Sequence, residues 1–186
     1  NNMKDLSLHI LDIIQNSIKA ESTLIEVEIS EDTKEDLLTI TIKDNGRGMD
    51  EELLKKVLDP FVTTRTTRKV GLGLSLFKAS CEQAEGSLTV DSVLGKGTIV
   101  YAKLKHSHID RKPIGDIAST MALAISSNEN IDFIYKHKVD GNEFLLDTRE
   151  IKKELDGVSV ALPEVTCWIK DYIEEGIKNI NGGNDL

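Results

Sequence analysis

The sequence is poor in residues that would cross-link or rigidify it. Its 186 residues include two cysteines, three prolines and 4% aromatic residues. Cys81 and Cys167 are far apart and match no CxxC or metal-ligand spacing, so neither a disulfide framework nor a zinc site is predicted. We expect both thiols to be reduced and mostly buried.

Long apolar runs and positive charge are also scarce. No apolar run approaches the about 20 residues needed to span a bilayer, and no signal peptide is recognised before the first predicted helix. We therefore expect a cytoplasmic protein without membrane insertion. The chain has 23 Lys and Arg against 32 Asp and Glu, a net charge of −9, which disfavours nucleic acid as a partner. Hydrophobic residues still make up 39%, enough for a folded core.

Hydrophobic periodicity predicts helices and strands in the first part of the chain. Apolar residues recur at helical spacing over residues 5–20, and a polar stripe carrying His9, Asp12, Asn16 and Lys19 follows the opposite side. Further helices are predicted at 50–58 and 72–84, with a loop at 61–70 between them, and alternating strands at 25–30, 37–43, 87–91 and 98–104. This order predicts an α+β fold in which helices cover one face of a mixed sheet.

The character of the sequence changes near residue 105. A polar segment ending in Pro113 suggests a boundary, so we predict two domains, 3–105 and 106–186. The second is predicted as a small α+β module of unknown role. Its expected elements are a helix at 114–127, strands at 131–139 and 143–146 around the hairpin turn Asp140-Gly141, a short helix capped by Asp147, and a final helix opened by Pro163. In the hairpin turn, both central residues are expected to have positive φ.

The side chains of this second module carry no motif that we can assign to a function. Phe133, Tyr135 and Trp168 are expected in the core. The acidic helices are either a solvated face or a surface where a partner docks. His106 and His108, in the segment after residue 105, are expected to be solvated.

Asn16 and Asp12 are candidate catalytic and metal-binding residues on the first helix. An amide oxygen is a hard, neutral ligand suited to Mg²⁺, which takes its remaining ligands from water and phosphate. Asp12 lies one turn earlier on the same face, where a carboxylate can orient or deprotonate a nucleophile. An ordinary solvated helix face explains the same two residues when they are considered alone.

The DNGRGM segment at 44–49 follows an apolar strand. A carboxylate at the strand end, Asp44, can accept a hydrogen bond from the exocyclic amine of adenine. Gly46 and Gly48 remove side chains where a ligand or a tight turn needs room. The alternative is a plain turn, since Asp-Asn-Gly is a typical turn sequence.

A third block, TTRTTRKVGLGL at 63–74, combines cations with glycines at a helix start. Free backbone N–H groups and the helix dipole favour phosphate at such a place, and Arg65, Arg68 and Lys69 can neutralise phosphate charge. A loop of this kind can close over a nucleotide as a lid. By itself the GLGL pattern is weak evidence.

Together and in this order, the blocks resemble the GHKL superfamily ATP-binding domain of gyrase, heat-shock chaperones, histidine kinases and MutL-type proteins. The Asn16 segment resembles the N box, DNGRG the G1 box, Asp59-Pro-Phe the F box and Gly71-Leu-Gly the G2 box. The resemblance covers about residues 6–104 and implies a Bergerat-type α/β sandwich. It is closest to histidine kinases, because Lys19 and the DPFVTTR…GLGLSLFK pattern match that branch.

The resemblance implies roles for individual residues. Asn16 would hold Mg²⁺, Asp44 would bind adenine with support from Thr98, and Lys19 and Arg65 would approach the phosphates. The cofactors are then ATP and Mg²⁺, and the expected catalytic pair is Asp12 and Asn16. The full set expected at the nucleotide is Asn16, Lys19, Asp44, Gly46, Gly48, Met49, Phe61, Thr63, Thr64, Arg65, Gly71, Leu72, Gly73, Leu74 and Thr98.

The chain also departs from the histidine-kinase pattern. No helical hairpin with a phosphoacceptor histidine is recognised before the N box, and His9 is not in such a context. His9 is either a solvent-facing helix residue or a side chain near the phosphates. Many relatives that activate water carry glutamate where this chain has Asp12, and the shorter aspartate puts efficient hydrolysis in doubt.

Three functions are compatible with these residues. The first, which we favour, is a standalone protein kinase that transfers the γ-phosphoryl group of ATP to a partner protein. The second is an ATP-gated regulatory binding module, like an anti-sigma switch, with little or no turnover. The third is a MutL- or chaperone-like ATPase that forms a homodimer on ATP, against which Lys19 and the kinase-like lid weigh.

Overall fold

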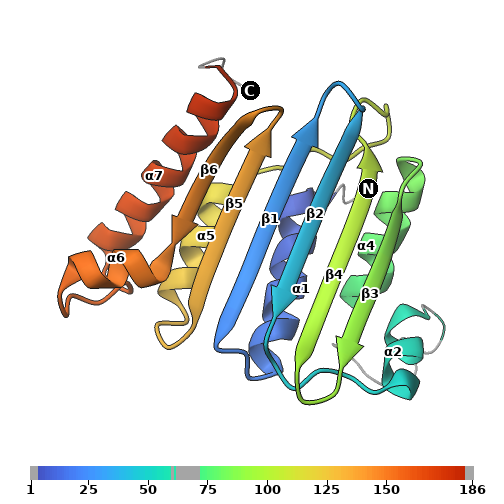
Figure 1. Cartoon of the computed structure of the whole chain (residues 1–186), viewed down its shortest axis with the longest axis horizontal. Coiled ribbons are helices and arrows are strands. Elements are labelled where there is room, and N and C mark those ends of the chain that lie inside the picture. The colour runs from blue at the N-terminus through green and yellow to red at the C-terminus, as the bar shows by residue number, and fades with distance from the viewer. Residues whose placement is uncertain (1–3, 60, 62–71, 183–186) are drawn as a thin grey trace.

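Six strands form one mixed sheet in the order β3-β4-β2-β1-β5-β6 (Figure 1). The computed structural model describes residues 4–59, 61 and 72–182. β1 pairs in parallel with β5, and the other neighbouring strands are antiparallel. The elements in chain order are α1 (Leu6–Lys19), β1 (Leu24–Asp32), β2 (Leu37–Asp44), α2 (Glu51–Leu58), α4 (Leu72–Gln83), β3 (Ser87–Val93), β4 (Gly97–Lys105), α5 (Ile117–Ser126), β5 (Asp132–Val139), β6 (Asn142–Asp147), α6 (Thr148–Leu155) and α7 (Pro163–Ile180).

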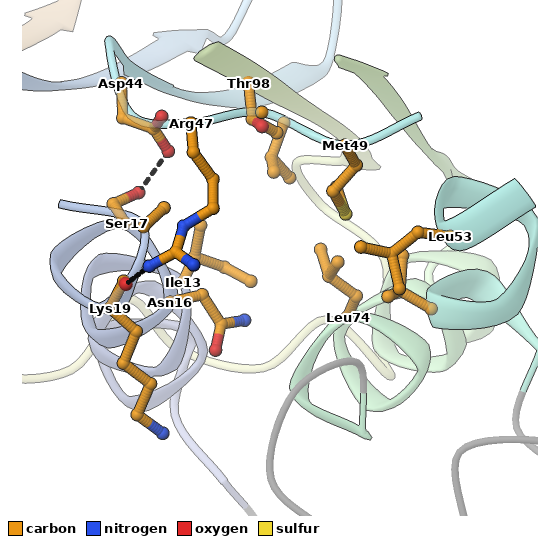
Figure 2. A pocket seen from close by; sticks show the side chains of 14 residues that line it. Ile13, Asn16, Ser17, Lys19, Asp44, Arg47, Met49, Leu53, Leu74 and Thr98 are labelled. Atoms are coloured by element: carbon orange, nitrogen blue, oxygen red, sulfur yellow. Dashed lines mark hydrogen bonds between the residues drawn. The ribbon is translucent and has the colours of Figure 1, made fainter. Parts of the chain in front are cut away.

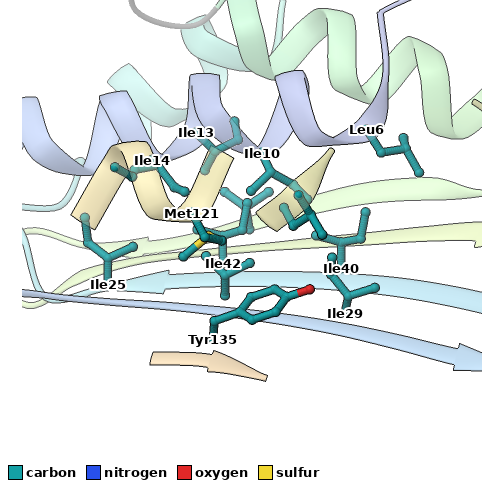
Figure 3. Close-up of a cluster of buried hydrophobic side chains, with 14 of the residues drawn as sticks. Leu6, Ile10, Ile13, Ile14, Ile25, Ile29, Ile40, Ile42, Met121 and Tyr135 are labelled. Atoms are coloured by element: carbon teal, nitrogen blue, oxygen red, sulfur yellow. The ribbon is translucent and has the colours of Figure 1, made fainter. Parts of the chain in front are cut away.

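The strands alternate between a buried face and a more exposed one, as a half-buried sheet requires. On β1, Ile25, Val27 and Ile29 point into the core, and Ile40 and Ile42 do the same on β2. Fully burying an aliphatic side chain of this size contributes about 1.5–3 kcal/mol. Figure 3 shows the isoleucines of α1 lying over these strand residues.

Helices cover one face of the sheet. α1, α4 and α5 lie behind the strands in Figure 1, and α7 contacts α5, β6 and β5. The predicted α+β architecture, a mixed sheet with helices on one face, is confirmed. Most predicted elements occur within a few residues of their expected ends, and Asp50 caps α2 by accepting from the Leu53 N–H at 2.8 Å. Among the described residues, no helix is long and apolar enough to cross a membrane.

The chain after residue 105 adds two strands to this sheet. β5 lies beside β1, and β6 forms the sheet edge. The first and last parts are further joined where the Leu6 N–H donates to Pro113 O at 2.9 Å and where Thr33 donates to the Asp140 carboxylate. The described residues after 105 therefore share one sheet and one core with the described residues before it. That residue 105 separates two folding units stays a prediction.

The expectation that His106 is solvated is wrong. Its Nε2 lies 3.0 Å from Oε1 of Glu31, and the other Glu31 oxygen lies 2.7 Å from Nε2 of the buried His137. Burial raises the pKa of Glu31, but the hydrogen bonds from His137 and His106 outweigh it and the pKa is lowered. His108 is also largely covered and lies 3.6 Å from Glu85. The segment after β4 is thus tied to the sheet by polar contacts.

Three expectations about the second half also need correction. Phe133 and Tyr135 are fully buried as expected, but Trp168 is 53% exposed. Both cysteines are free, yet Cys167 is exposed, whereas burial raises the pKa of Cys81 to about 12. In the β5–β6 turn only Asp140 has a positive φ, of 54°, because its N–H and carboxylate are fixed by hydrogen bonds to the β1–β2 end.

Candidate functional site

A cavity of about 300 Å³ opens between α1, α2, α4 and the adjoining ends of β2 and β4 (Figure 2). Its walls are mainly aliphatic, with polar groups at one end. Ligand pockets in proteins commonly begin at this size. The lining residues are Ile13, Asn16, Ser17, Lys19, Ala20, Asp44, Arg47, Gly48, Met49, Leu53, Val57, Leu74, Thr98 and Val100.

Asp44 is the one carboxylate among these lining residues, and it is held in a fixed orientation. It ends β2 and is only 9% exposed. Ser17 Oγ donates to Oδ2 at 2.5 Å, and the Gly46 N–H donates to Oδ1 at 2.9 Å. Each carboxylate oxygen keeps a further lone pair. Asp44 can therefore accept a hydrogen bond from a ligand amine inside the cavity.

The loop after Asp44 passes close to other backbone segments. A Cβ on Gly46 would lie 2.8 Å from Ala20 O, and one on Gly48 would lie 2.1 Å from Val93 O. Gly48 also has a φ of 70°. The glycines allow the loop to pass between α1 and the β3–β4 turn, which a side chain would prevent.

A small hydroxyl network holds the wall next to Asp44, because Thr98 on β4 is the cross-strand partner of Asp44 on β2. Ser92 Oγ lies 2.8 Å from Thr98 Oγ1 and accepts from the Met49 N–H at 2.7 Å. This network fixes Thr98 on β4 and Met49 before α2 on the same side of the cavity, as Figure 2 shows. The Met49 thioether and the nearby leucines supply the flat apolar contacts that suit a planar ring.

Asn16 and two cations lie toward the mouth. The Asn16 amide faces the cavity in Figure 2, whereas Lys19 and Arg47 are exposed. The Arg47 guanidinium donates to Lys19 O at 2.7 Å, which ties the loop to the end of α1. The mouth therefore carries positive charge and one neutral oxygen ligand, a combination that suits phosphate groups.

The donor set at the mouth fits Mg²⁺ only together with a phosphate ligand. Among the described residues, no group of three or more His, Cys, Asp or Glu side chains is placed to hold a metal ion. Magnesium keeps several waters and often takes one or two protein ligands plus phosphate oxygens. Asn16 can be such a ligand, and the nucleotide would complete the coordination.

Asp12 does not line the cavity. Its carboxylate forms an ion pair with Lys4. Asp12 also packs closely against the start of α4, because a Cβ on Gly73 would lie 3.2 Å from the Asp12 Cβ. Phe61 also lies outside the cavity and is 82% exposed. The predicted residues that line the cavity are Asn16, Lys19, Asp44, Gly48, Met49, Leu74 and Thr98.

Part of the predicted site lies outside the described residues. This concerns Thr63, Thr64, Arg65 and Gly71, together with the side chain of Leu72. Their roles stay predictions.

Ser17 and Arg47 line the cavity although neither is among the predicted site residues. Ser17 falls at the continuation of the apolar stripe through Ile13 and Ile14, yet it is a hydroxyl with 2% exposure. A polar residue at a core position is a signal for a specific hydrogen bond. Arg47 lies within the DNGRG motif, where a positive charge next to two glycines indicates a residue at the binding site.

His9 is neither solvent-facing nor among the cavity-lining residues. It is 3% exposed and stacks on Phe77 of α4, with ring centroids 5.0 Å apart. The pKa of His9 is lowered to about 4, chiefly by burial and then by the positive charge of Lys4, while the charge of Asp12 opposes the shift. The expectation of a solvent-facing His9 is therefore wrong, because α4 packs over the side of α1 that the helical pattern alone shows as polar. That His9 lies near the phosphates stays a prediction.

This shift predicts an acid-sensitive fold. Since the folded state disfavours the imidazolium, the unfolded chain binds the proton more readily below pH about 6.5. The contribution of neutral His9 is complete above that pH and is lost as the pH falls toward 4. We expect His9→Gln to flatten the dependence of the free energy of unfolding on pH in this window. Parallel slopes for both proteins in urea titrations would contradict the assignment.

Comparison with known proteins places the chain in a family. Residues 1–108 match the family model described as histidine kinase-, DNA gyrase B- and HSP90-like ATPase. The sensor histidine kinase WalK of Bacillus subtilis is 35% identical over 111 residues, which is 55% of this chain and 18% of that protein. The non-motile and phage-resistance protein of Caulobacter vibrioides is 31% identical over 119 residues, or 59% of this chain and 14% of that protein.

These relatives are much longer, so the chain spans a small part of their length. Among solved structures, the N-terminal domain of a DNA repair protein superposes with a TM-score of 0.55 at 19% identity, over 77% of this chain and 52% of that one. At that identity the likeness concerns the fold alone. The family match covers more than half of the 186 residues, so the chain belongs to the histidine kinase-, DNA gyrase B- and HSP90-like (GHKL) ATPases and contains their ATP-binding domain.

Proposed function

We propose that the cavity binds Mg·ATP, with the adenine at Asp44 and the phosphates near Asn16 and Lys19. The observation that carries this proposal is the buried Asp44 carboxylate, which Ser17 and the Gly46 N–H hold in place at the inner end of an apolar cavity. A carboxylate buried there needs donors, and the adenine amine supplies one. The positive mouth lies at the opposite end from this acceptor (Figure 2).

We further propose that the γ-phosphoryl group passes to a protein acceptor. Phosphoryl transfer depends on positioning and on neutralising the charge of the transferred group. Lys19 brings a positive charge to the mouth, and Asn16 brings an oxygen ligand for Mg²⁺. The metal, when bound with the nucleotide, would supply further charge neutralisation. Asn16 and Lys19 would thereby orient the phosphates toward the open side of the cavity.

The four histidines of this sequence are all engaged in other contacts. His9 is packed on Phe77, and His137 is buried between Tyr135 and Glu31. His106 bonds the same glutamate, and His108 lies against Glu85. A phosphoacceptor must expose its ring nitrogen to the nucleotide, and these four rings are covered or engaged elsewhere.

Replacing Asn16 tests this proposal. Asn16→Ala is expected to reduce transfer of label from γ-labelled ATP to candidate partner proteins by about tenfold. The loss is not complete, because a water molecule can take the position of the lost amide oxygen. Gln15→Ala is the matched control, because Gln15 is an exposed amide on the same helix that does not line the cavity. Equal loss in both variants, or undiminished transfer in Asn16→Ala, would overturn the proposal.

The position of Asp12 favours a second function, an ATP-gated binding module with little turnover. Its carboxylate is paired with Lys4 and does not line the cavity, so Asp44, at the proposed adenine end, is the one carboxylate among the described lining residues. ATP would then change the affinity for a partner through differential contacts. Partner affinity that depends on ATP while no label is transferred would support this function over the kinase.

A further inference from the structure

A groove lies at the edge of the sheet formed by β6, where α6 and α7 meet it. It encloses about 610 Å³ and is separate from the ATP cavity, with which it shares no lining residue. Figure 1 shows α6 and α7 at the β6 side of the sheet, whereas α2 lies at the β3 side. The groove is lined by Leu145, Leu146, Asp147, Glu150, Ile151, Glu154, Leu155, Trp168 and Tyr172.

Two aromatic side chains form one wall of the groove. Trp168 and Tyr172 stack with ring centroids 5.1 Å apart and an interplanar angle of 7°. They are nevertheless 53% and 42% exposed. Tryptophan and tyrosine are enriched among the residues that dominate binding energy in protein interfaces. An ordered aromatic pair left half in water is therefore suited to a contact with another molecule.

The charge of the groove has one sign. Three of its lining residues are carboxylates, Asp147, Glu150 and Glu154, and none is lysine, arginine or histidine. Asp147 already accepts from Arg149 at 2.8 Å, and Glu150 lies 3.7 Å from Lys153. The pair of Glu150 with Lys153 is solvent-exposed and weak, whereas Arg149 holds Asp147 through two hydrogen bonds. A cation entering the groove can therefore compete for Glu150 or pair with Glu154, and would also meet the faces of Trp168 and Tyr172.

The edge of β6 faces the same region. Within the part of the chain that the structure describes, β6 has only β5 as a strand neighbour in the sheet. Its outer edge therefore offers backbone groups without a strand partner, which a neighbouring extended segment can use. Leu145 and the partly buried Ile151 and Leu155 supply apolar contacts beside that edge.

We propose that this groove binds a segment of a partner protein in which lysine or arginine stands next to apolar side chains. The basic side chain would stack on Trp168 and pair with Glu150 or Glu154, and the apolar ones would pack against Leu145 and Leu155. This assignment is independent of the ATP site, because no residue is shared. It would give a partner a docking point remote from the nucleotide.

The chain provides its own reporter for this groove. Trp168 is the single tryptophan of the sequence, so its emission monitors this site alone. We would titrate the full chain with a synthetic peptide of about twelve residues alternating lysine and arginine with leucine, and with its glutamate counterpart. We expect a saturable change in emission with the basic peptide that weakens as salt rises, and no change with the acidic one.

Charge reversal locates the site. The double substitution Glu150→Lys and Glu154→Lys is expected to weaken the basic peptide by about tenfold and to allow the acidic peptide to bind. Glu174→Lys with Glu175→Lys is the matched control, because it changes the net charge equally on exposed α7 positions outside the groove. Circular dichroism of both double variants verifies the fold.

Several outcomes would overturn the proposal. They are an equal response to both peptides, an equal loss in the two double variants, and no change in emission at all. Sedimentation that shows a dimer dissociated by Trp168→Ala would assign the groove to a second copy of the chain instead. ATP affinity, measured in the same samples, separates a failure here from a failure of the proposed nucleotide site.

Discussion

Asp44→Asn is expected to weaken ATP binding by about a hundredfold while the protein stays folded. The carboxylate accepts from Ser17 Oγ at 2.5 Å and from the Gly46 N–H at 2.9 Å. In asparagine an NH₂ group replaces one of these oxygens. This group can donate to the serine hydroxyl, but its second N–H then points toward the adenine amine, which is also a donor. The loss of the charged acceptor and the repulsion between the asparagine NH₂ and the adenine amine together cost about 3 kcal/mol of binding free energy.

Titration calorimetry with ATP measures this effect, and urea unfolding measures the accompanying change in stability. We expect the free energy of unfolding to fall by only about 1 kcal/mol, since the Gly46 hydrogen bond can be kept. Asp91→Asn is the matched control, because Asp91 is an exposed strand carboxylate outside the cavity. ATP affinity that is unchanged in Asp44→Asn would refute the assignment of this residue to adenine.

The local elements were predictable because their signals lie within a few residues. Three helices were predictable from residues within or next to them: α1 from its apolar pattern, α2 from the cap at Asp50, and α7 from Pro163 at its start. The same holds for the candidate site, where Asn16 and Asp44 were recognisable from short motifs. Local sequence is therefore sufficient for element type and for the order of the site blocks.

Contacts between distant segments had no such signal. β5 lies in parallel beside β1, although six described elements, β2, α2, α4, β3, β4 and α5, separate the two strands in the chain. Parallel neighbours are joined by long crossovers, and the sequence of neither strand specifies which strand it pairs with. The polar stripe of α1 likewise gave no hint that Phe77 covers His9. Tertiary packing decided both cases.

Exposure was the least predictable property in the second half of the chain. Ile169 and Ile173 of α7 are buried, yet Trp168 beside them is half exposed. A helix in contact with one layer buries a single stripe, and the residue next to that stripe falls at its rim. The apolar character of tryptophan alone could not distinguish the rim from the core.

Gly48→Ala is expected to be the most destabilising of the substitutions considered, and Gly95→Ala provides a direct comparison. Both glycines have positive φ, 70° and 81°, so alanine pays the same backbone cost of about 1–2 kcal/mol at either position. They differ in space: a Cβ on Gly48 would lie 2.1 Å from Val93 O, whereas nothing lies within 4 Å of one on Gly95. The difference between the two variants therefore isolates the steric term.

The clash at residue 48 involves backbone atoms of Val93, which cannot move aside by a side-chain rotation. Val93 ends β3, and the following turn is bound to the loop where the Gly95 N–H donates to Arg47 O at 2.6 Å. Relief requires the β3–β4 turn or the cavity loop to move, so we expect Gly48→Ala to lose at least about 4 kcal/mol of unfolding free energy together with ATP affinity. Gly95→Ala should lose only the backbone cost and keep ATP binding. Equal losses in urea unfolding would show that backbone strain, and not the contact with Val93, makes glycine necessary at residue 48.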